Sequence, residues 1–363
     1  MNLETQPRRF EADSLIDAAC RRIRDVQTAT GAIPWFEGGV FDPWNHVEAA
    51  MALGVGGHRS AAERAFDRLA ETQTCYGAWW GAYGNAVPMH DHVQMERAPG
   101  PEVIDTNFTA YVAAGVWHLY RLTGARQMLV RYWPMVARAL NFVVAQQLPG
   151  GGIAWCVDAE GRPAQEALRA GSSSVYFSLG CGLAAAGALG LSRPGWQQAR
   201  ARLGAALSLT QPQATAAQFA GKSRYSMDWY YPVLCGAIGG AQARKHLAEG
   251  WARYVRPGLG CLCVDDAPWV TVAETAELAL AIAATGNRLR AREVLGWALP
   301  WRDDSGAFWM GYQYEEGIVW PAERPAWTAA AVVLAVDALY GLTPASTVFT
   351  APHASAADRV KCA

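Results

Sequence analysis

The stretch FDPWNHVEAA, residues 41–50, places two acids, a histidine, an amide and a tryptophan directly before small apolar residues. Carboxyl and imidazole groups are the usual proton donors and acceptors in enzymes, and burial shifts their pKa toward the working pH. A tryptophan beside them offers a flat apolar face to a substrate. The stretch therefore predicts a site of acid–base chemistry, with Asp42, His46 and Glu48 as catalytic candidates and Trp44 and Asn45 as substrate contacts.

The same combination of a polar group and an aromatic ring recurs before five other apolar helical segments. The further catalytic candidates there are Asp228, Glu277 and Glu323. The further candidates for substrate binding are Asp105, Asn107, Tyr176, Arg224, Trp229, Tyr230, Trp269, Glu274, Trp320 and Trp327. If these helices form a ring with their N-termini at one end, we expect the candidate residues to line one shared funnel.

Helix capping is the competing interpretation of the acids. Asp42 and Asp105 stand where an N-cap belongs, and Thr271 with Glu274 fits a capping box. An acid near a helix N-terminus is stabilising by roughly 0.3–1 kcal/mol without any catalytic role. Capping does not require Glu277, however, and it does not explain why tryptophan and tyrosine recur beside the acids. Both interpretations stay open at this stage.

Three functions fit such a funnel. In a glycoside hydrolase or lyase, one carboxylic acid protonates the leaving oxygen and a second carboxylate acts as base or nucleophile. Asp228, which adjoins Trp229, is then the leading general acid, while Glu48, Glu277 and Glu323 are candidate bases. The first alternative is an intramolecular cyclase of specialised metabolism, in which a water-excluding cavity assists ring closure with loss of a leaving group. The second alternative is a non-catalytic binding scaffold whose acids only cap helices.

Two kinds of helical segment alternate along the chain, six of each. One kind has a single apolar stripe, which is typical of surface helices. It covers residues 11–27, 61–73, 125–147, 196–207, 241–255 and 288–299. The other kind is apolar nearly all round, which predicts burial on every side. It covers residues 46–57, 109–122, 175–190, 231–240, 273–286 and 327–341.

Six buried helices inside six amphipathic ones predict an all-α (α/α)6 toroid. We expect one domain over residues 11–343, closed by the first amphipathic helix against the last buried one, with residues 1–10 and 344–363 as flexible tails. An open α-solenoid and a two-lobed helical bundle are the alternatives. A solenoid needs a polar-faced terminal repeat, and residues 327–341 are too apolar to supply one.

Loops rich in glycine and aromatic residues separate the helices. The stretch QTCYGAW, residues 73–79, resembles the Q-x-x-x-G-x-W repeat of squalene/hopene cyclases and related prenyltransferase-type α/α toroids, and looser copies begin at Gln27 and Gln147. The resemblance implies a toroid in which glutamine and tryptophan tie a helix end to the next turn. The catalytic D-x-D-D motif of those cyclases is matched only by CVDD, residues 263–266, where the first aspartate is replaced.

Composition limits the partners of the protein. The formal net charge of −1, with no basic run, argues against nucleic acid as a partner. No uncharged apolar stretch reaches the roughly 18 residues of a membrane span. The eight cysteines are scattered without zinc-ligand spacing, so we expect reduced thiols in a cytoplasmic protein with no metal and no cofactor. A small-molecule substrate is the expected partner, and the need for a second subunit stays open.

Overall fold

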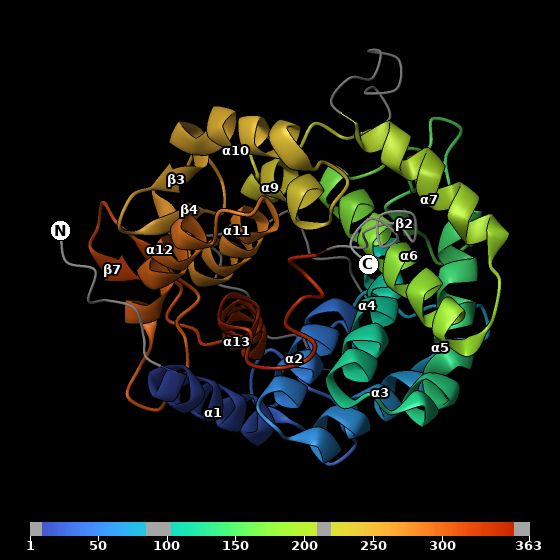
Figure 1. Ribbon diagram of the computed structural model, residues 1–363, viewed down its shortest axis with the longest axis horizontal. Helices are drawn as coiled ribbons and strands as arrows, with labels where there is room; N and C mark the ends of the chain where they lie inside the picture. Colours follow the sequence, from blue (N-terminus) through green and yellow to red (C-terminus); the bar gives the residue numbers. More distant parts are fainter. Residues whose placement is uncertain (1–8, 85–102, 209–218, 352–363) are drawn as a thin grey trace, which may run out of the picture.

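The computed structural model describes residues 9–84, 103–208 and 219–351. Within these ranges, twelve α-helices form two concentric rings (Figure 1). The inner helices are α2 (Pro43–Val55), α4 (Thr106–Thr123), α6 (Arg169–Leu189), α9 (Ser226–Leu234), α11 (Val272–Ala284) and α13 (Ala326–Tyr340). The outer helices are α1 (Arg9–Val26), α3 (Arg59–Thr72), α5 (Arg126–Ala145), α7 (Pro194–Leu207), α10 (Gly240–Tyr254) and α12 (Arg288–Ala298).

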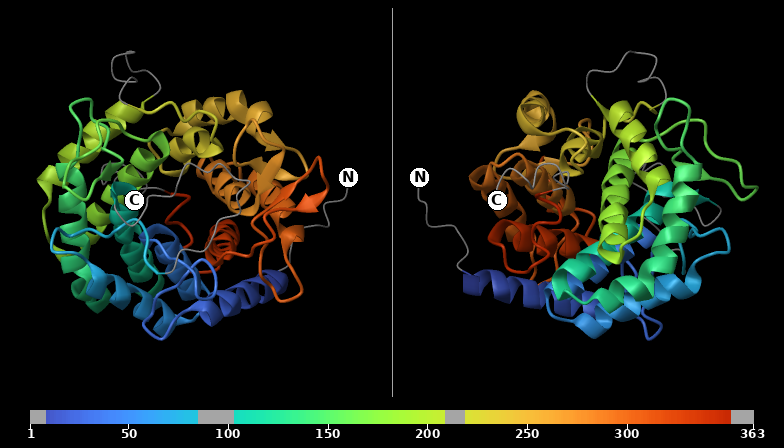
Figure 2. Two further views of the ribbon diagram at one scale, coloured as in Figure 1. Left: turned by 180° about the vertical axis from the view of Figure 1, so that it is seen from behind. Right: turned by 45° about the vertical axis from the view of Figure 1, so that its right-hand side comes forward.

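Both rings close on themselves. The last inner helix, α13, packs against α11 on one side and against the first inner helix, α2, on the other. The first outer helix, α1, packs against α13, and the view from behind shows the same closed arrangement (Figure 2, left). The prediction of an all-α (α/α)6 toroid with alternating inner and outer helices is therefore confirmed. An open solenoid and a two-lobed bundle do not fit this packing.

The inner helices are rich in alanine and glycine because they pack on every side. A Cβ atom added to Gly115 in α4 would lie 2.5 Å from Val47 in α2 and 2.9 Å from Phe66 in α3. Helix α6 is long and apolar enough to cross a membrane by composition, yet 67% of its most apolar window is buried. It packs between α4 and α9, so its hydrophobicity belongs to the core of the toroid.

Short strands connect the helices on the side of the ring where the inner helices begin. Strands β1 (Ile104–Asp105) and β2 (Cys156–Val157) pair antiparallel, with Asp105 opposite Cys156. A second sheet has the order β3-β4-β5-β6-β7. Its strands are β3 (Val255–Arg256), β4 (Gly260–Leu262), β5 (Trp269–Thr271), β6 (Gly311–Gln313) and β7 (Ile318–Val319), and a 3-10 turn, η1 (Leu299–Trp301), follows α12. Because β1 leads directly into α4 and β5 into α11, these strands fix where the two helices start.

Three glutamines join neighbouring outer helices, as the Q-x-x-x-G-x-W resemblance implies. The side-chain amide of each donates to the carbonyl of the glycine four residues later and to a carbonyl of the next outer helix. These bonds run from Gln27 to Gly31 (3.1 Å) and Ala61 (2.9 Å), from Gln73 to Gly77 (2.7 Å) and Met135 (2.9 Å), and from Gln147 to Gly151 (2.8 Å) and Ala199 (2.9 Å). The repeat is thus a mechanical clamp between successive helix pairs.

The glycines of these clamps are required by backbone geometry. Gly77 has a φ of +92°, and an added Cβ would lie 2.8 Å from the carbonyl oxygen of Arg138. Gly31 and Gly151 have φ values of +87° and +96°, and an added Cβ would meet outer-helix carbonyls at 2.4 and 2.8 Å. Positive φ and such close backbone approach both exclude a side chain.

The chain after α13 returns to the core. Ala345, Val348 and Phe349 are buried, and the Phe349 ring stacks on Phe177 with centroids 5.3 Å apart. The structure therefore differs from the expected flexible tail over residues 344–351, because apolar side chains there cover the C-terminal end of the inner ring. Helix α1 also begins inside the expected N-terminal tail, whereas residues 1–8 and 352–363 lie outside the described ranges.

Candidate active site

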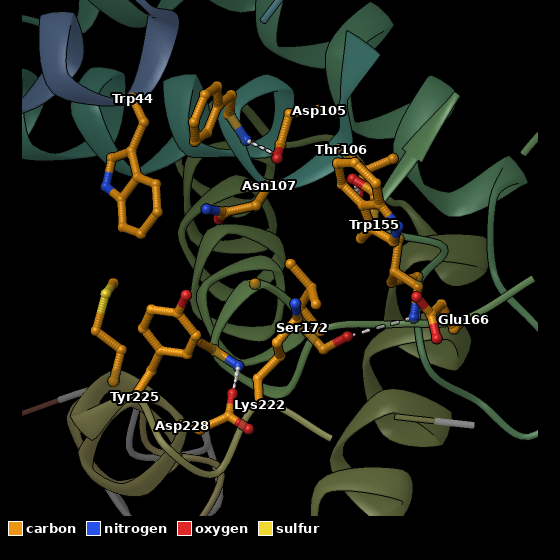
Figure 3. A pocket seen from close by; sticks show the side chains of 16 residues that line it. Trp44, Asp105, Thr106, Asn107, Trp155, Glu166, Ser172, Lys222, Tyr225 and Asp228 are labelled. Carbon is orange, nitrogen blue, oxygen red and sulfur yellow. Dashed lines mark hydrogen bonds between the residues drawn. The ribbon is translucent and has the colours of Figure 1, made fainter. Parts of the chain in front are cut away.

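A pocket of about 400 Å³ opens at the N-terminal ends of α2, α4, α6 and α9. This volume lies within the roughly 300–1,000 Å³ of small-molecule sites. The pocket is lined by Trp44, Asp105, Thr106, Asn107, Phe108, Ile153, Trp155, Glu166, Leu168, Ala170, Gly171, Ser172, Lys222, Tyr225, Met227 and Asp228 (Figure 3). The ring thus brings together the starts of four inner helices, as the funnel prediction requires, but not those of all six.

Asp105 occupies one wall of the pocket. It ends β1 and is the N-cap of α4, where its Oδ1 accepts a hydrogen bond of 2.9 Å from the Phe108 N–H. The residue is only 6% exposed. Burial raises the pKa of the Asp105 carboxyl to about 7, against the opposing effect of the backbone N–H donors. A substantial fraction of Asp105 is therefore protonated at neutral pH, although it also caps a helix.

Asp228 lies on the opposite side of the pocket, in the first turn of α9 (Figure 3). Its Oδ1 accepts a hydrogen bond of 3.2 Å from the Ala170 N–H at the start of α6. Burial raises the pKa of the Asp228 carboxyl, while the Ala170 N–H and the charges of Arg169 and Lys222 lower it. Two carboxyl groups in different electrostatic surroundings thus face one pocket.

Polar and aromatic side chains complete the walls. The buried Oδ1 atom of Asn107 accepts no hydrogen bond from the described residues, and the side chain points into the pocket (Figure 3). Trp44, Trp155 and Tyr225 supply aromatic surface around it. Asn107 is therefore placed to accept a hydrogen bond from a ligand hydroxyl held against these rings.

Asp42 is the N-cap of α2, as the capping interpretation predicts. Its Oδ2 accepts hydrogen bonds of 2.7 Å from Trp35 Nε1 and of 2.7 Å from the Asn45 amide, and its Oδ1 accepts one of 2.9 Å from the Asn45 N–H. The residue is 2% exposed and does not line the 400 Å³ pocket. These contacts describe a structural anchor that involves both Asp42 and Asn45.

His46 is fully buried between α2 and α3. Its Nδ1 accepts a hydrogen bond of 3.0 Å from the Ile33 N–H, so Nε2 carries the proton and donates to the Ala65 carbonyl at 2.9 Å. Burial lowers the pKa of the imidazole to about 4. The structure therefore places a neutral His46 among backbone groups, away from the pocket.

Glu48 and Glu277 meet below the pocket. Both line a second, much smaller cavity of about 20 Å³ inside the inner ring. Glu48 accepts hydrogen bonds from Trp44 Nε1 (3.1 Å) and from the Tyr111 hydroxyl (3.2 Å). The expected ligand contact Tyr230 is instead fully buried, and its hydroxyl donates to Glu277 at 2.5 Å.

The candidates at the starts of α11 and α13 lie apart from the 400 Å³ pocket. These residues are Trp269, Glu274, Trp320, Glu323 and Trp327. Trp269 Nε1 donates to the Trp320 carbonyl at 2.7 Å, and the Thr271 hydroxyl donates to the Glu274 carboxylate. Thr271 is the N-cap of α11, but its hydroxyl does not bond a backbone N–H, so the predicted capping box is incomplete.

Three further candidates face outward from the inner ring. The Tyr176 ring lies under the guanidinium of Arg200, 3.9 Å from its centroid. Trp229 Nε1 donates to a carbonyl of α10 at 3.0 Å. Arg224, expected to hold an anionic group, pairs with Asp266 at 2.8 Å on the surface. None of these three lines the 400 Å³ pocket.

Several lining residues come from loops that the sequence pattern did not single out. They include Trp155, Glu166, Lys222 and Tyr225, and Met227 in the first turn of α9 also lines the pocket. Trp155 was detectable, because it is the tryptophan of the third Q-x-x-x-G-x-W copy. Lys222 and Tyr225 flank the candidate Arg224, but helical periodicity says nothing about the direction in which loop side chains point.

An (α/α)6 toroid whose funnel carries facing carboxyl groups and aromatic walls is the architecture of a carbohydrate-active enzyme. Solved structures share this fold over nearly the whole chain. A glycosidase variant in complex with glucose aligns with a TM-score of 0.69 at 15% identity, covering 92% of this chain and 97% of that one. The GH63 mannosylglycerate hydrolase from Thermus thermophilus aligns with a TM-score of 0.61 at 14% identity, covering 88% and 99%.

A sequence relative defines the family more closely, although no family model matches the chain. The MMP endo-(1,4)-3-O-methyl-alpha-D-mannosidase of Mycolicibacterium hassiacum is 46% identical over 327 residues, which cover 90% of this chain and 86% of the relative. The chain belongs to the family of this mannosidase and is a glycoside hydrolase. The prediction of a glycoside hydrolase is thus confirmed. The (α/α) toroid is confirmed as well, but the resemblance to squalene/hopene cyclases is not, because the structural relatives are glycosidases.

Proposed function

We propose that this enzyme hydrolyses α-(1,4) linkages within a glycan of 3-O-methylated mannose units. The name of the 46% identical relative describes this activity for that protein. The pocket supports the same substrate class, because Trp44, Phe108, Trp155 and Met227 give it large apolar surfaces. Methylation of a sugar removes a hydroxyl donor and adds an apolar group, which such surfaces accommodate without an unsatisfied polar contact. The ring-closing and non-catalytic alternatives have no comparable support.

We further propose Asp105 as the general acid and Asp228 as the carboxylate base. The observation that carries this assignment is the presence of both carboxyl groups on facing walls of one pocket. A general acid must hold a proton at the working pH, and burial raises the pKa of Asp105 to about 7. Burial raises the pKa of Asp228 as well, but Arg169, Lys222 and the Ala170 N–H oppose this shift and favour the charged form. This assignment keeps Asp228 as a catalytic residue but makes it the base, whereas the sequence predicted it to be the general acid.

The test compares Asp105→Asn and Asp228→Asn on 3-O-methylated α-(1,4)-mannan oligosaccharides, with products identified by mass spectrometry. Loss of either group should lower kcat by about 10²–10⁴-fold. A substrate with an activated aryl leaving group, such as a dinitrophenyl glycoside, releases a weakly basic aryloxide that needs no protonation. It should therefore restore turnover of Asp105→Asn but not of Asp228→Asn. Arg224→Ala, outside the pocket, is the matched control and should retain wild-type kinetics. Full activity of Asp228→Asn would refute the base assignment and turn attention to Glu166, the third carboxyl residue that lines the pocket.

The pH dependence of the wild-type enzyme tests the acid separately. Asp105 loses its proton as the pH rises through its pKa of about 7, so kcat/KM should fall above that value.

We also propose that the enzyme is located in the cytoplasm. The seven cysteines within the described ranges form no disulfide bonds, which agrees with a reducing cytoplasm.

A further inference from the structure

Two carboxyl groups lie beneath the pocket, around a cavity that no Lys, Arg or His of the described residues lines. Glu48 of α2 and Glu277 of α11 line the same cavity of about 20 Å³ in the middle of the inner ring. The remaining residues that line it are Tyr111, Ser174, Phe177, Tyr231, Leu234, Cys235, Leu280, Ala331, Leu334 and Phe349. Two negative charges in such apolar surroundings would repel each other strongly and lose most of their hydration.

Neutral donors surround both carboxyl groups. Glu277 accepts short hydrogen bonds from the hydroxyls of Tyr230 (2.5 Å) and Tyr231 (2.6 Å), which stabilise its charged form. Glu48 accepts from Tyr111 and from the Trp44 indole at 3.2 and 3.1 Å. The donor pattern therefore favours the charge on Glu277 and the proton on Glu48.

Protonation equilibria agree with this geometry. Burial and the charge of Glu277 raise the pKa of Glu48 well above its usual range, and the nearby Asp42 raises it further. Burial raises the pKa of Glu277 to about 7, while the two tyrosine hydroxyls lower it and Glu274 raises it. The main causes of these shifts are burial, other carboxyl groups and the hydrogen bonds of Trp44 and the tyrosines, with no basic side chain of the described residues among them.

Trp44 connects this cluster to the pocket. Its ring lines the 400 Å³ pocket, while its Nε1 atom donates to Glu48 underneath. The ring also packs edge-on against Tyr111 and Tyr231, with centroids 5.8 and 5.9 Å apart. The orientation of this aromatic surface is thus set by contacts with the acid cluster.

We propose that Glu48 and Glu277 share a single proton and act as a positioning pair that fixes the Trp44 indole as a platform for the substrate. The inference rests on the proposed function, because it treats Trp44 as a surface for a sugar ring. In this arrangement Glu48 acts through Trp44 and does not contact the reacting atoms. The two glutamates, both catalytic candidates from the sequence, are then distinct from the pair formed by Asp105 and Asp228.

The first test separates positioning from catalysis with two substitutions of Glu48. Glu48→Gln keeps an oxygen that accepts from the indole, so kcat and KM should stay within about twofold of wild type. Glu48→Ala removes the acceptor, so KM should rise about tenfold while kcat changes less. Asp337→Asn, another buried acid on an inner helix, is the control and should leave both constants unchanged. A fall of 10²-fold or more in kcat for Glu48→Gln would overturn the proposal, because that is the effect of removing a catalytic carboxyl.

A double-mutant cycle tests whether Glu48 acts through the indole. Trp44→Phe removes the N–H donor but leaves Glu48 intact. If the two residues form one unit, the effects of Trp44→Phe and Glu48→Ala on KM will not add in the double variant. Additive effects would refute the coupling.

Infrared spectroscopy tests the shared proton without any substrate. Asp105 is also partly protonated at neutral pH, so the comparison is made in an Asp105→Asn background. At pH 7 this protein should show a carbonyl band of a protonated carboxylic acid that Glu48→Gln removes and Asp337→Asn retains. An unchanged band in Glu48→Gln would overturn the shared proton. The glycan assignment fails independently if wild-type enzyme does not cleave methylated mannan, since the infrared result does not depend on the substrate.

Discussion

The clamp glycine Gly77 gives a prediction whose magnitude follows from geometry. Gly77→Ala places a side chain at a φ of +92°, which costs roughly 1–2 kcal/mol for an L-residue. Its Cβ would also lie 2.8 Å from the Arg138 carbonyl oxygen, inside ordinary van der Waals contact. Relief requires α5 to shift relative to the loop, at a cost of about 1–3 kcal/mol. The reduced entropy of the unfolded chain offsets about 0.4–1 kcal/mol. We expect a net loss of about 3 kcal/mol in the free energy of unfolding, within a range of about 1–5 kcal/mol.

A matched glycine isolates the steric part of this loss. Gly124, which follows α4, has a φ of +65° and no heavy atom within 4 Å of an added Cβ. Gly124→Ala should therefore lose only about 1 kcal/mol, because only the backbone conformation is unfavourable. Urea unfolding curves of both variants measure the difference, and kcat should be unchanged in both because neither glycine lines the pocket. Equal stability losses would refute the steric argument.

Three further predictions concern single side chains. Asn107→Ala should raise KM about tenfold without loss of stability, and an unchanged KM would remove Asn107 from the site. Phe349→Ala should lower the free energy of unfolding by about 3 kcal/mol in urea titrations, and a loss below about 0.5 kcal/mol would contradict its packing on Phe177. His46 is neutral when folded but takes up a proton below about pH 6.5 when unfolded. Its contribution to stability should therefore fall by about 3 kcal/mol as the pH drops from about 6.5 to about 4, and the stability difference between wild type and His46→Gln should shrink accordingly.

The architecture of this protein could be predicted because it depends on repeated, local patterns. All-round apolar segments such as residues 327–341 can only be buried, and their alternation with amphipathic segments leaves few arrangements other than two concentric rings. The C-terminal segment escaped prediction because its few apolar residues, among them Phe349, follow no helical period.

The site could be predicted only in part, because its members sit on loops and on capping positions. Helix starts supplied Trp44, Asp105, Asn107 and Asp228, but the pattern could not tell which of the six starts would converge. The pairing of β1 with β2, which brings Trp155 beside the start of α4, depends on contacts distant in sequence. Helix capping and a place in the pocket are not alternatives, because Asp105 both caps α4 and lines the pocket.

The C-terminal segment that packs under the inner ring limits how a polymer can approach the enzyme. Phe349 lies against Phe177 and lines the small central cavity, and Arg121 of α4 donates to the carbonyl of Pro344 (3.5 Å). The C-terminal segment therefore closes the central hole of the toroid at the end opposite the pocket. A glycan chain cannot pass through the ring. If the substrate is the glycan proposed above, a long chain has to lie across the mouth of the pocket, bring one linkage to the carboxyl groups and leave by the side on which it arrived. The enzyme would then have to release and rebind the polymer between successive cleavages. The cleavage sites should therefore be distributed along the polymer and should not progress from one end.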